Sequence, residues 1–266
     1  VLLSVIPPEI LLLKNSGGVW SKPDKLDIPG RNINAGNFSA DGKRIYFQGV
    51  LEGGYGSLDI WYIVRTDTGW SRPLNIGFPV NTSKMEGQPS FTLDGTVYYT
   101  AALEGSGWNR GIYRSRSING EYTEPQVLNK LINTQYIDAY PFIAPDESFL
   151  LFSSSRPAMD ESDLRIYVSF RSKDDKWSEP VNLCRIMKFD VTSRLPYLSP
   201  DSKYLFFQSG GNIYWVDAEI IKKAGENKLT ENTGNNNDKK TDNHCKFDSN
   251  STFVVLLYRA EGRGTD

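Results

Sequence analysis

The chain has 266 residues, of which 39% are hydrophobic and 12% aromatic, and its formal net charge is −2. This composition is typical of a soluble globular protein, and the nearly balanced charge offers no basic surface for nucleic acid or an anionic membrane. The single histidine, His244, lies in a polar stretch, so a Ser-His-Asp triad and a multi-histidine metal site are not expected. The two cysteines, Cys184 and Cys245, are too few for a dense disulfide framework.

The chain begins with VLLSVIPPEILLLK, an apolar stretch that two prolines interrupt. It is too short to span a bilayer, so no membrane span is expected. We expect residues 10–13 to form a buried strand, and the alternative interpretation is that residues 1–8 are the remnant of a signal peptide.

A phrase with an aspartate between two apolar runs recurs along the chain. Its copies are FSADGKRIYFQ (38–48), FTLDGTVYYTA (91–101), IAPDESFLLFS (143–153) and LSPDSKYLFFQ (198–208). Asp followed by Gly, Glu or Ser is typical of a tight turn, because the Asp side chain can accept a hydrogen bond from the backbone two residues on. The flanking runs alternate as strands do, so each copy predicts a hairpin.

Two companion phrases follow each hairpin in the same order. The first predicts a third strand and reads DIWYIV (59–64), GIYRSR (111–116), RIYVSF (165–170) and NIYWVD (212–217). The second places a proline on an outermost strand, where a missing N–H does least harm, and reads VWSKP (19–23), GWSRP (69–73), EYTEP (121–125) and KWSEP (176–180). We expect its aromatic residues Trp70, Tyr122 and Trp177 to pack between units, and Asp59 and Asp163 to accept hydrogen bonds from nearby loop amides.

Four-stranded units that repeat at the spacing of these hairpin phrases predict an all-β fold. We expect a β-propeller of five four-stranded blades in one domain, 1–266. The expected blades are 31–80, 84–132, 136–186 and 191–232, followed by a closing blade made of 9–23 plus 245–258. In this scheme FDSNSTFVVLL (247–257) is a degenerate copy of the hairpin phrase. Residues 229–231 repeat the outermost strand, and residues 232–244 form a polar loop. The alternative is an incomplete or six-bladed propeller with 218–266 as a disordered tail.

The hairpin phrases SADGKRIYF, TLDGTVYYT, APDESFLLF and SPDSKYLFF resemble the TolB-type, WD-like propeller repeat over residues 19–217. The chain is similar to small bacterial propeller proteins that are often loosely labelled sialidase-like. The resemblance implies an extracytoplasmic location, periplasmic or secreted, and we expect a monomer. The sialidase Asp-box, Ser-x-Asp-x-Gly-x-Thr-Trp, is not matched, so sialidase activity is not implied.

The innermost strands carry polar residues that differ between the repeats and are expected at the mouth of a central channel. Residues seven and eight before each turn aspartate are Ile33-Asn34, Glu86-Gly87, Asp138-Ala139 and Ser193-Arg194. The expected ligand-binding residues are Asn34, Gln88, Tyr140, Arg194 and the loop residue Trp108. Because propellers serve many functions, our first hypothesis is a binding protein that recognises a glycan, peptide or protein partner at this mouth.

The alternative hypothesis is a glycoside hydrolase. Five-bladed arabinanase-like enzymes place paired carboxylates at this mouth, which suggests Glu86 as general acid and Asp138 as base, with Arg194 orienting the substrate. The acid would need a raised pKa. No cofactor is expected, and a structural Ca²⁺ held by Glu86 and Asp138 remains an open alternative.

Overall fold

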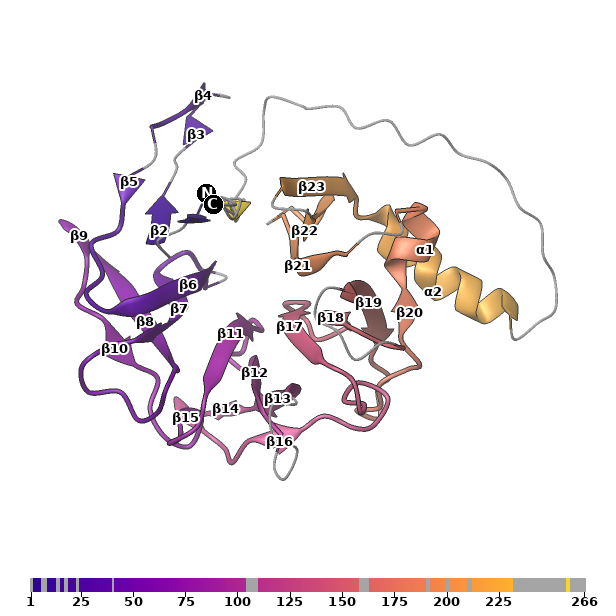
Figure 1. Ribbon diagram of the computed structural model, residues 1–266, viewed down its shortest axis with the longest axis horizontal. Coiled ribbons are helices and arrows are strands. Elements are labelled where there is room, and N and C mark those ends of the chain that lie inside the picture. Colours follow the sequence, from indigo (N-terminus) through magenta and orange to yellow (C-terminus); the bar gives the residue numbers. More distant parts are fainter. Residues whose placement is uncertain are drawn as a thin grey trace, which may run out of the picture.

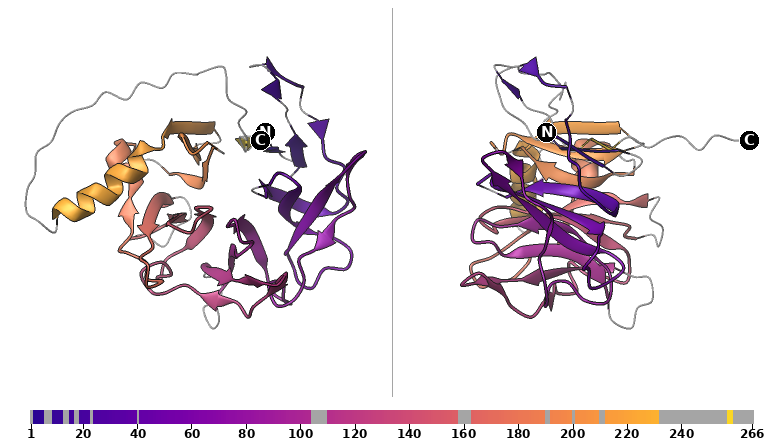
Figure 2. Two further views of the ribbon diagram at one scale, coloured as in Figure 1. Left: turned by 180° about the vertical axis from the view of Figure 1, so that it is seen from behind. Right: turned by 90° about the vertical axis from the view of Figure 1, so that its left-hand side faces the viewer.

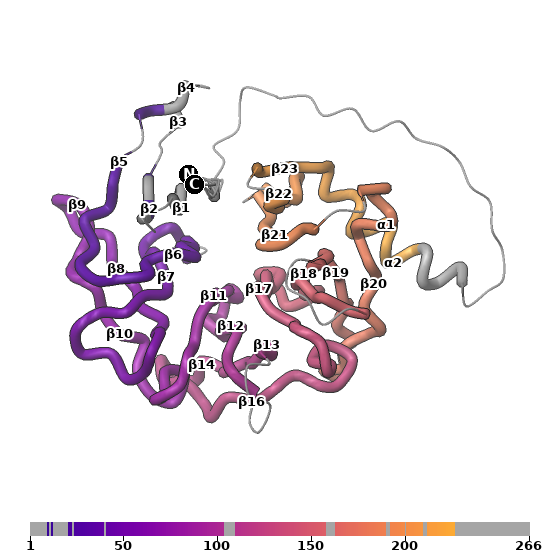
Figure 3. The backbone as a smooth tube through the Cα atoms, in the orientation of Figure 1, coloured from indigo at the N-terminus to yellow at the C-terminus, as the bar shows by residue number. Residues whose placement is uncertain are grey.

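The computed structural model describes residues 2–5, 9–12, 15–16, 19–22, 24–39, 41–103, 110–157, 163–189, 192–199, 201–209, 212–231 and 257–258. Its sheets stand side by side around a central axis, so the chain is a β-propeller, as the repeats predicted (Figures 1 and 2). Figure 3 shows the chain passing once around the ring from β6 to β23. No helix in the described ranges is long and apolar enough to cross a membrane.

Four sheets follow the repeats. The first contains β6 (Arg31–Phe38), β7 (Arg44–Val50), β8 (Asp59–Thr66) and β10 (Leu74–Asn75), with β9 (Gly69–Trp70) paired to the end of β8. The second contains β11 (Glu86–Phe91), β12 (Val97–Ala102), β13 (Arg110–Ser115) and β16 (Gln126–Val127), beside the hairpin of β14 (Ser117–Ile118) and β15 (Glu121–Tyr122). The third contains β17 (Asp138–Ile143), β18 (Phe149–Ser154), β19 (Arg165–Phe170) and β20 (Val181–Asn182). The fourth contains β21 (Arg194–Leu198), β22 (Tyr204–Ser209) and β23 (Asn212–Asp217).

A further sheet joins described strands from both ends of the chain. Its order is β24 (Leu257–Tyr258), β1 (Leu2–Val5), β2 (Glu9–Leu12) and β5 (Asp24–Lys25), and a short hairpin of β3 (Asn15–Ser16) and β4 (Val19–Trp20) lies between β2 and β5 in the sequence. Residues 10–12 are therefore a strand, and Ile10 is buried in it. The number of blades stays a prediction, and the proposed hairpin copy in 247–256 lies outside the described residues.

The hairpin turns have the chemistry that the aspartates predicted. The Asp41 carboxylate accepts hydrogen bonds from the Ser39 hydroxyl at 2.5 Å and from the Lys43 N–H at 3.0 Å. The equivalent aspartates close their turns in the same way, and hydrogen bonding lowers the pKa of all four: Asp41, Asp94, Asp146 and Asp201. These bonds stabilise a turn in which the side chain replaces a backbone acceptor.

The aromatic-Ser/Thr-x-Pro phrase brings the chain back along the third strand. Its hydroxyl accepts a hydrogen bond from a backbone N–H of that strand: Ser71 from Val64, Thr123 from Arg116 and Ser178 from Phe170. The two-residue outermost strands β10, β16 and β20 then follow the proline. Within this phrase, the Trp177 ring lies edge-on to Tyr98 of the preceding sheet, with ring centroids 6.3 Å apart, which confirms that it packs between units.

The hydrophobic core is divided among the contacts between neighbouring sheets, which we call seams. The seam between the second and third sheets, for example, buries Tyr98, Ile112, Leu150 and Phe152. Phe91 of the second sheet stacks on Tyr46 of the first with centroids 3.7 Å apart. Each sheet thus buries its faces against its neighbours rather than around one common centre.

Two helices were not predicted. α1 (Leu183–Met187) follows β20, and α2 (Glu219–Glu231) follows β23. The expectation of an outermost strand at 229–231 is wrong, because these residues end α2. The Asp217 carboxylate accepts the Glu219 N–H at 2.8 Å where the helix begins, and Ile220, Ile221 and Ala224 place one buried face against the core.

Candidate functional site

The innermost strands of the four repeat sheets, β6, β11, β17 and β21, are interrupted by β-bulges. Figure 1 shows these strands nearest the centre of the ring. Their register shifts just after four equivalent pairs, Asn34 with Gln48, Gly87 with Thr100, Ala139 with Ser153 and Arg194 with Gln208. The alignment that placed Asn34, Gly87, Ala139 and Arg194 at one position is therefore confirmed.

Each bulge contains a non-glycine residue with positive φ. These residues, which we call the bulge residues, are Ala35 (φ 54°), Gln88 (φ 48°), Tyr140 (φ 56°) and Leu195 (φ 56°). All four are half-buried. Such backbone is costly for a residue with a Cβ and persists where the surrounding structure holds it, often at functional sites. The proline that follows three of the four bulge residues was a signal that our sequence interpretation missed.

Side chains of the preceding sheet hold two of the four bulges, those at Gln88 and Tyr140. Oε1 of Gln48 accepts the N–H of Gln88 at 2.9 Å, and Oγ1 of Thr100 accepts the N–H of Tyr140 at 3.2 Å. A Cβ on Gly87 would clash with Oε1 of Gln48, so glycine allows this close approach. These two bulges are thus fixed by bonds that cross the seams.

Glu86 is the first residue of β11, and its side chain is hydrogen-bonded within the loop that precedes this strand. Its two carboxylate oxygens accept the Thr82 N–H at 3.0 Å and the Thr82 hydroxyl at 2.5 Å. The residue is only 2% exposed, and this burial raises the pKa of the Glu86 carboxyl. The nearby Asp59 carboxylate raises it further, while Asp59 itself accepts the N–H groups of Tyr55 and Gly56 as expected.

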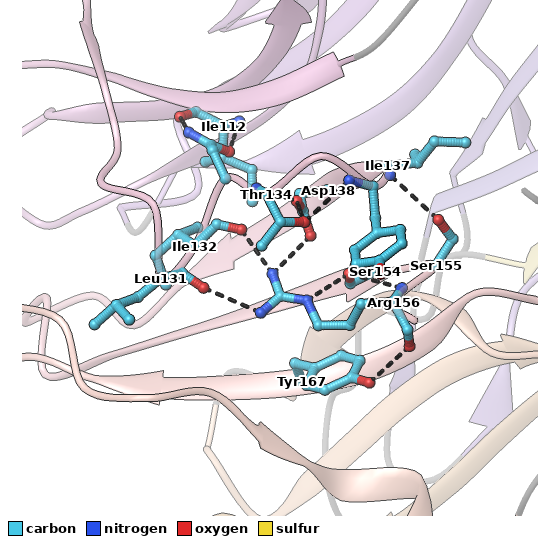
Figure 4. A network of polar contacts seen from close by, with 12 residues as sticks. Ile112, Leu131, Ile132, Thr134, Ile137, Asp138, Ser154, Ser155, Arg156 and Tyr167 are labelled. Atoms are coloured by element: carbon cyan, nitrogen blue, oxygen red, sulfur yellow. Dashed lines mark hydrogen bonds and ion pairs between the residues drawn. The ribbon is translucent and has the colours of Figure 1, made fainter. Parts of the chain in front are cut away.

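Asp138 occupies the equivalent position on β17 and is fully buried. It accepts the N–H and the hydroxyl of Thr134, both at 2.7 Å, and forms an ion pair with Nη2 of Arg156 at 2.7 Å (Figure 4). The same guanidinium donates to the carbonyls of Leu131 and Ile132 and stacks over the Tyr167 ring. With the bond from Nε to the Ser154 hydroxyl, all three guanidinium nitrogens of Arg156 donate hydrogen bonds inside the protein.

Glu86 and Asp138 belong to a repeated loop motif that our sequence interpretation overlooked. The motif reads Asn-Thr-x-x-x-Glu at 81–86 and Asn-Thr-x-x-x-Asp at 133–138. Asn81 pairs through both amide atoms with the backbone of Ile60, and Asn133 pairs in the same way with Ile112. In Asn-Thr-x-x-x-acid, the amide therefore fixes the loop to the third strand, and the acid closes it onto the threonine.

The other residues expected to bind ligand are distributed around the ring centre. Gln88 and Tyr140 are bulge residues, Asn34 lies on β6, and Arg194 donates from Nε to Oε1 of Gln208 at 3.1 Å. Trp108 lies outside the described residues. Oε1 of Gln88 is buried and accepts no hydrogen bond among the described residues, so a donor from a ligand would satisfy it.

The calcium alternative gains no support from this geometry. The oxygens of Glu86 and Asp138 are directed at the loop donors of their own motifs. In the described part of the chain, no group of three or more His, Cys, Asp or Glu side chains is placed to hold a metal ion. Calcium requires six to eight oxygen ligands, which a single carboxylate on each strand does not provide.

Comparisons with known proteins identify the fold. No protein-family model and no curated protein matches the sequence. The structure is similar to TolB from Acinetobacter baumannii, with a TM-score of 0.54 and 19% identity over 79% of this chain and 46% of that one. It is also similar to a TolB-type protein from Agrobacterium tumefaciens, with a TM-score of 0.51 and 17% identity over 82% of this chain and 76% of that one.

A thermostable family-43 glycoside hydrolase is similar at the same level, with a TM-score of 0.52 and 15% identity over 78% of this chain and 81% of that one. The chain spans less than half of the Acinetobacter TolB. Identities this low show the fold alone. The chain therefore has the β-propeller fold that TolB proteins and a family-43 glycoside hydrolase share.

Proposed function

We propose that the chain is a binding protein that recognises a glycan or peptide ligand with residues at the centre of its ring, in an extracytoplasmic compartment. One observation carries the choice of binding over hydrolysis. Both candidate catalytic carboxylates serve as loop closures, and Glu86 and Asp138 are 2% and 0% exposed. A general acid or base must come within hydrogen-bond reach of its substrate, and these two groups are already occupied by Thr82, Thr134 and Arg156.

The innermost strands supply suitable contacts for such a ligand. Gln88 presents an acceptor without a partner among the described residues, Tyr140 offers an aromatic ring, and Arg194 provides a cation. The seam bonds hold the backbone of Gln88 and Tyr140 before any ligand arrives, which reduces the entropy lost on binding. The TolB-type resemblance of the repeats supports the proposed extracytoplasmic location.

A glycan array and a peptide array, each probed with labelled protein, test the proposal. We expect specific binding that Gln88→Ala and Arg194→Ala weaken at least tenfold. Arg65→Ala is the matched control, because Arg65 is exposed near the outer end of β8 and should leave binding unchanged.

The same glycans, followed by detection of new reducing ends, test the hydrolase alternative. The binding proposal predicts no turnover. Turnover that both Glu86→Gln and Asp138→Asn abolish, in variants that remain folded, would replace the binding proposal with a glycoside hydrolase. Binding that survives Gln88→Ala and Arg194→Ala would overturn the assignment of the site.

A further inference from the structure

Arg194 is the only cation among the four equivalent residues that precede the bulge residues. The other three are Asn34, Gly87 and Ala139. Arg194 is half-buried on β21, and its side chain donates from Nε to Oε1 of Gln208 at 3.1 Å. No carboxylate of the described residues pairs with it, whereas Arg114 and Arg156 at the seams each have one. Its positive charge is therefore not balanced within the described part of the chain.

The preceding sheet leaves room for this side chain. At the seam between the first and second sheets, Gln48 approaches Gly87 so closely that a Cβ on the glycine would clash with Oε1. The residue equivalent to Gln48 on β18 is Ser153, and β18 contacts β21. A long side chain thus faces a glycine at one seam, and a short side chain stands at the equivalent place where the next sheet carries Arg194.

Two buried polar groups beside Arg194 lack partners in the described residues. Oγ of Ser153 is fully buried without a hydrogen bond, so the bond that Gln48 makes to a bulge N–H has no counterpart here. The bond from Arg194 fixes which end of the Gln208 amide faces it, and this leaves Nε2 of Gln208 buried and unsatisfied. Unsatisfied buried groups are uncommon in native proteins and need a physical reason. Space and orientation for the Arg194 guanidinium account for both.

We propose that Arg194, oriented by Gln208, binds the carboxylate of an acidic sugar at the ring centre. Gln208 holds Nε, so the two Nη groups are left for the ligand. Their planar fork matches the two oxygens of a carboxylate, and one guanidinium balances one negative charge. A phosphate monoester carries close to two negative charges, which a single guanidinium does not balance. Because the ring centre is the proposed ligand site, this ligand class depends on the function proposed above.

The neighbouring innermost strands favour a sugar over an acidic peptide. Strands β11, β17 and β21 follow one another around the ring centre (Figure 1) and carry Gln88, Tyr140 and Arg194. A ligand that spans them meets the unsatisfied acceptor of Gln88, then an aromatic ring, then a cation. A uronic acid carries the matching groups on one ring, which are hydroxyl donors, an apolar C–H face and a carboxylate.

Paired ligands that differ in one group test the proposal without any variant. Oligomers of galacturonic acid and of glucuronic acid are titrated by calorimetry beside the same oligomers with each carboxylate converted to an uncharged amide. We expect at least one acid oligomer to bind, and to bind at least tenfold more tightly than its amide. Failure of both acid oligomers to bind overturns the proposal. Equal affinity of acid and amide also overturns it, but binding that Gln88→Ala still weakens would leave the proposed binding function standing.

Two variants connect this preference with Arg194. Arg194→Met removes the cation, and Gln208→Glu retains an acceptor for Nε but adds a counter-charge. In both, the acid should lose its advantage over the amide, whereas the control Arg65→Met, in an exposed residue of β8, should keep it. A purely structural Gln208 would leave the advantage intact in Gln208→Glu, and that result overturns its positioning role. Acidic peptides that bind more tightly than the uronic acid oligomers, and that Arg194→Met releases, overturn the sugar as the ligand.

Discussion

Replacing Asp138 by Asn tests whether this carboxylate stabilises a loop or performs chemistry. Asp138 accepts three hydrogen bonds, from the N–H and hydroxyl of Thr134 and from Nη2 of Arg156, each 2.7 Å long. Asn retains one acceptor oxygen and no charge, so the Arg156 side chain, only 16% exposed, loses its counter-charge. Removing one partner of a buried ion pair costs about 3–5 kcal/mol, and we expect the free energy of unfolding to fall by that amount.

Urea unfolding at pH 7, followed by tryptophan fluorescence, measures this loss. The double variant Asp138→Asn/Arg156→Met serves as the control, because it leaves no unpaired charge and should regain most of the lost free energy. The slope of the free energy against urea concentration should not change. A loss of less than about 1 kcal/mol, with no recovery in the double variant, would refute the assignment of Asp138 to loop closure and to the ion pair with Arg156.

Three further predictions concern other parts of the ring. Burial raises the pKa of Glu86, so the contribution of this residue to stability is greatest at low pH and is lost as pH rises through the raised pKa. Glu86→Gln should therefore gain stability relative to wild type as pH rises from 5 to 8 in urea unfolding. A difference in unfolding free energy between variant and wild type that is the same at both pH values would contradict this. Hydrogen bonds from Arg114 lower the pKa of Asp175 to about 2, so its contribution is present above its ordinary pKa of 3.8 and is lost as pH falls toward 2. Because Asp175 is 38% exposed and screened by solvent, Asp175→Asn should cost only about 1 kcal/mol at pH 7, and a cost that persists at pH 2 would count against the ion pair. Trp177, 5% exposed and packed against Tyr98, should cost about 3–5 kcal/mol when replaced by Ala, and a thermal melt close to that of wild type would rule out a packing role.

The repeated phrases predicted the sheets because the interactions that form each turn and each strand are local. An aspartate at a turn, an alternating strand and a proline at an edge each act within a few residues, as the turn at Asp41 and the strand after Pro73 show. Helix α2 was missed because Ile220, Ile221 and Ala224 were assigned to a repeat by position, although their spacing fits one helical face.

The site was harder to predict than the fold because burial depends on neighbours from distant parts of the sequence. Glu86 and Asp138 were correctly placed at the start of innermost strands. Their exposure was not predictable from spacing, since it depends on whether Thr82, Thr134 and Arg156 occupy their oxygens. The threonine and asparagine were visible in the sequence, and the repeat of Asn-Thr-x-x-x-acid would have indicated a structural role.

The bonds that cross the seams have a consequence for how such a ring tolerates sequence change. The two bonds that hold the bulges at Gln88 and Tyr140 each join a backbone N–H to one side-chain oxygen, from Gln48 in one case and Thr100 in the other. A backbone donor is the same whatever side chain its residue carries, and two chemically different acceptors, an amide oxygen and a hydroxyl, can bind it. The residues facing the ring centre are therefore free to diversify from blade to blade while the blades remain joined, so a repeat can be copied first and given a new binding role afterwards.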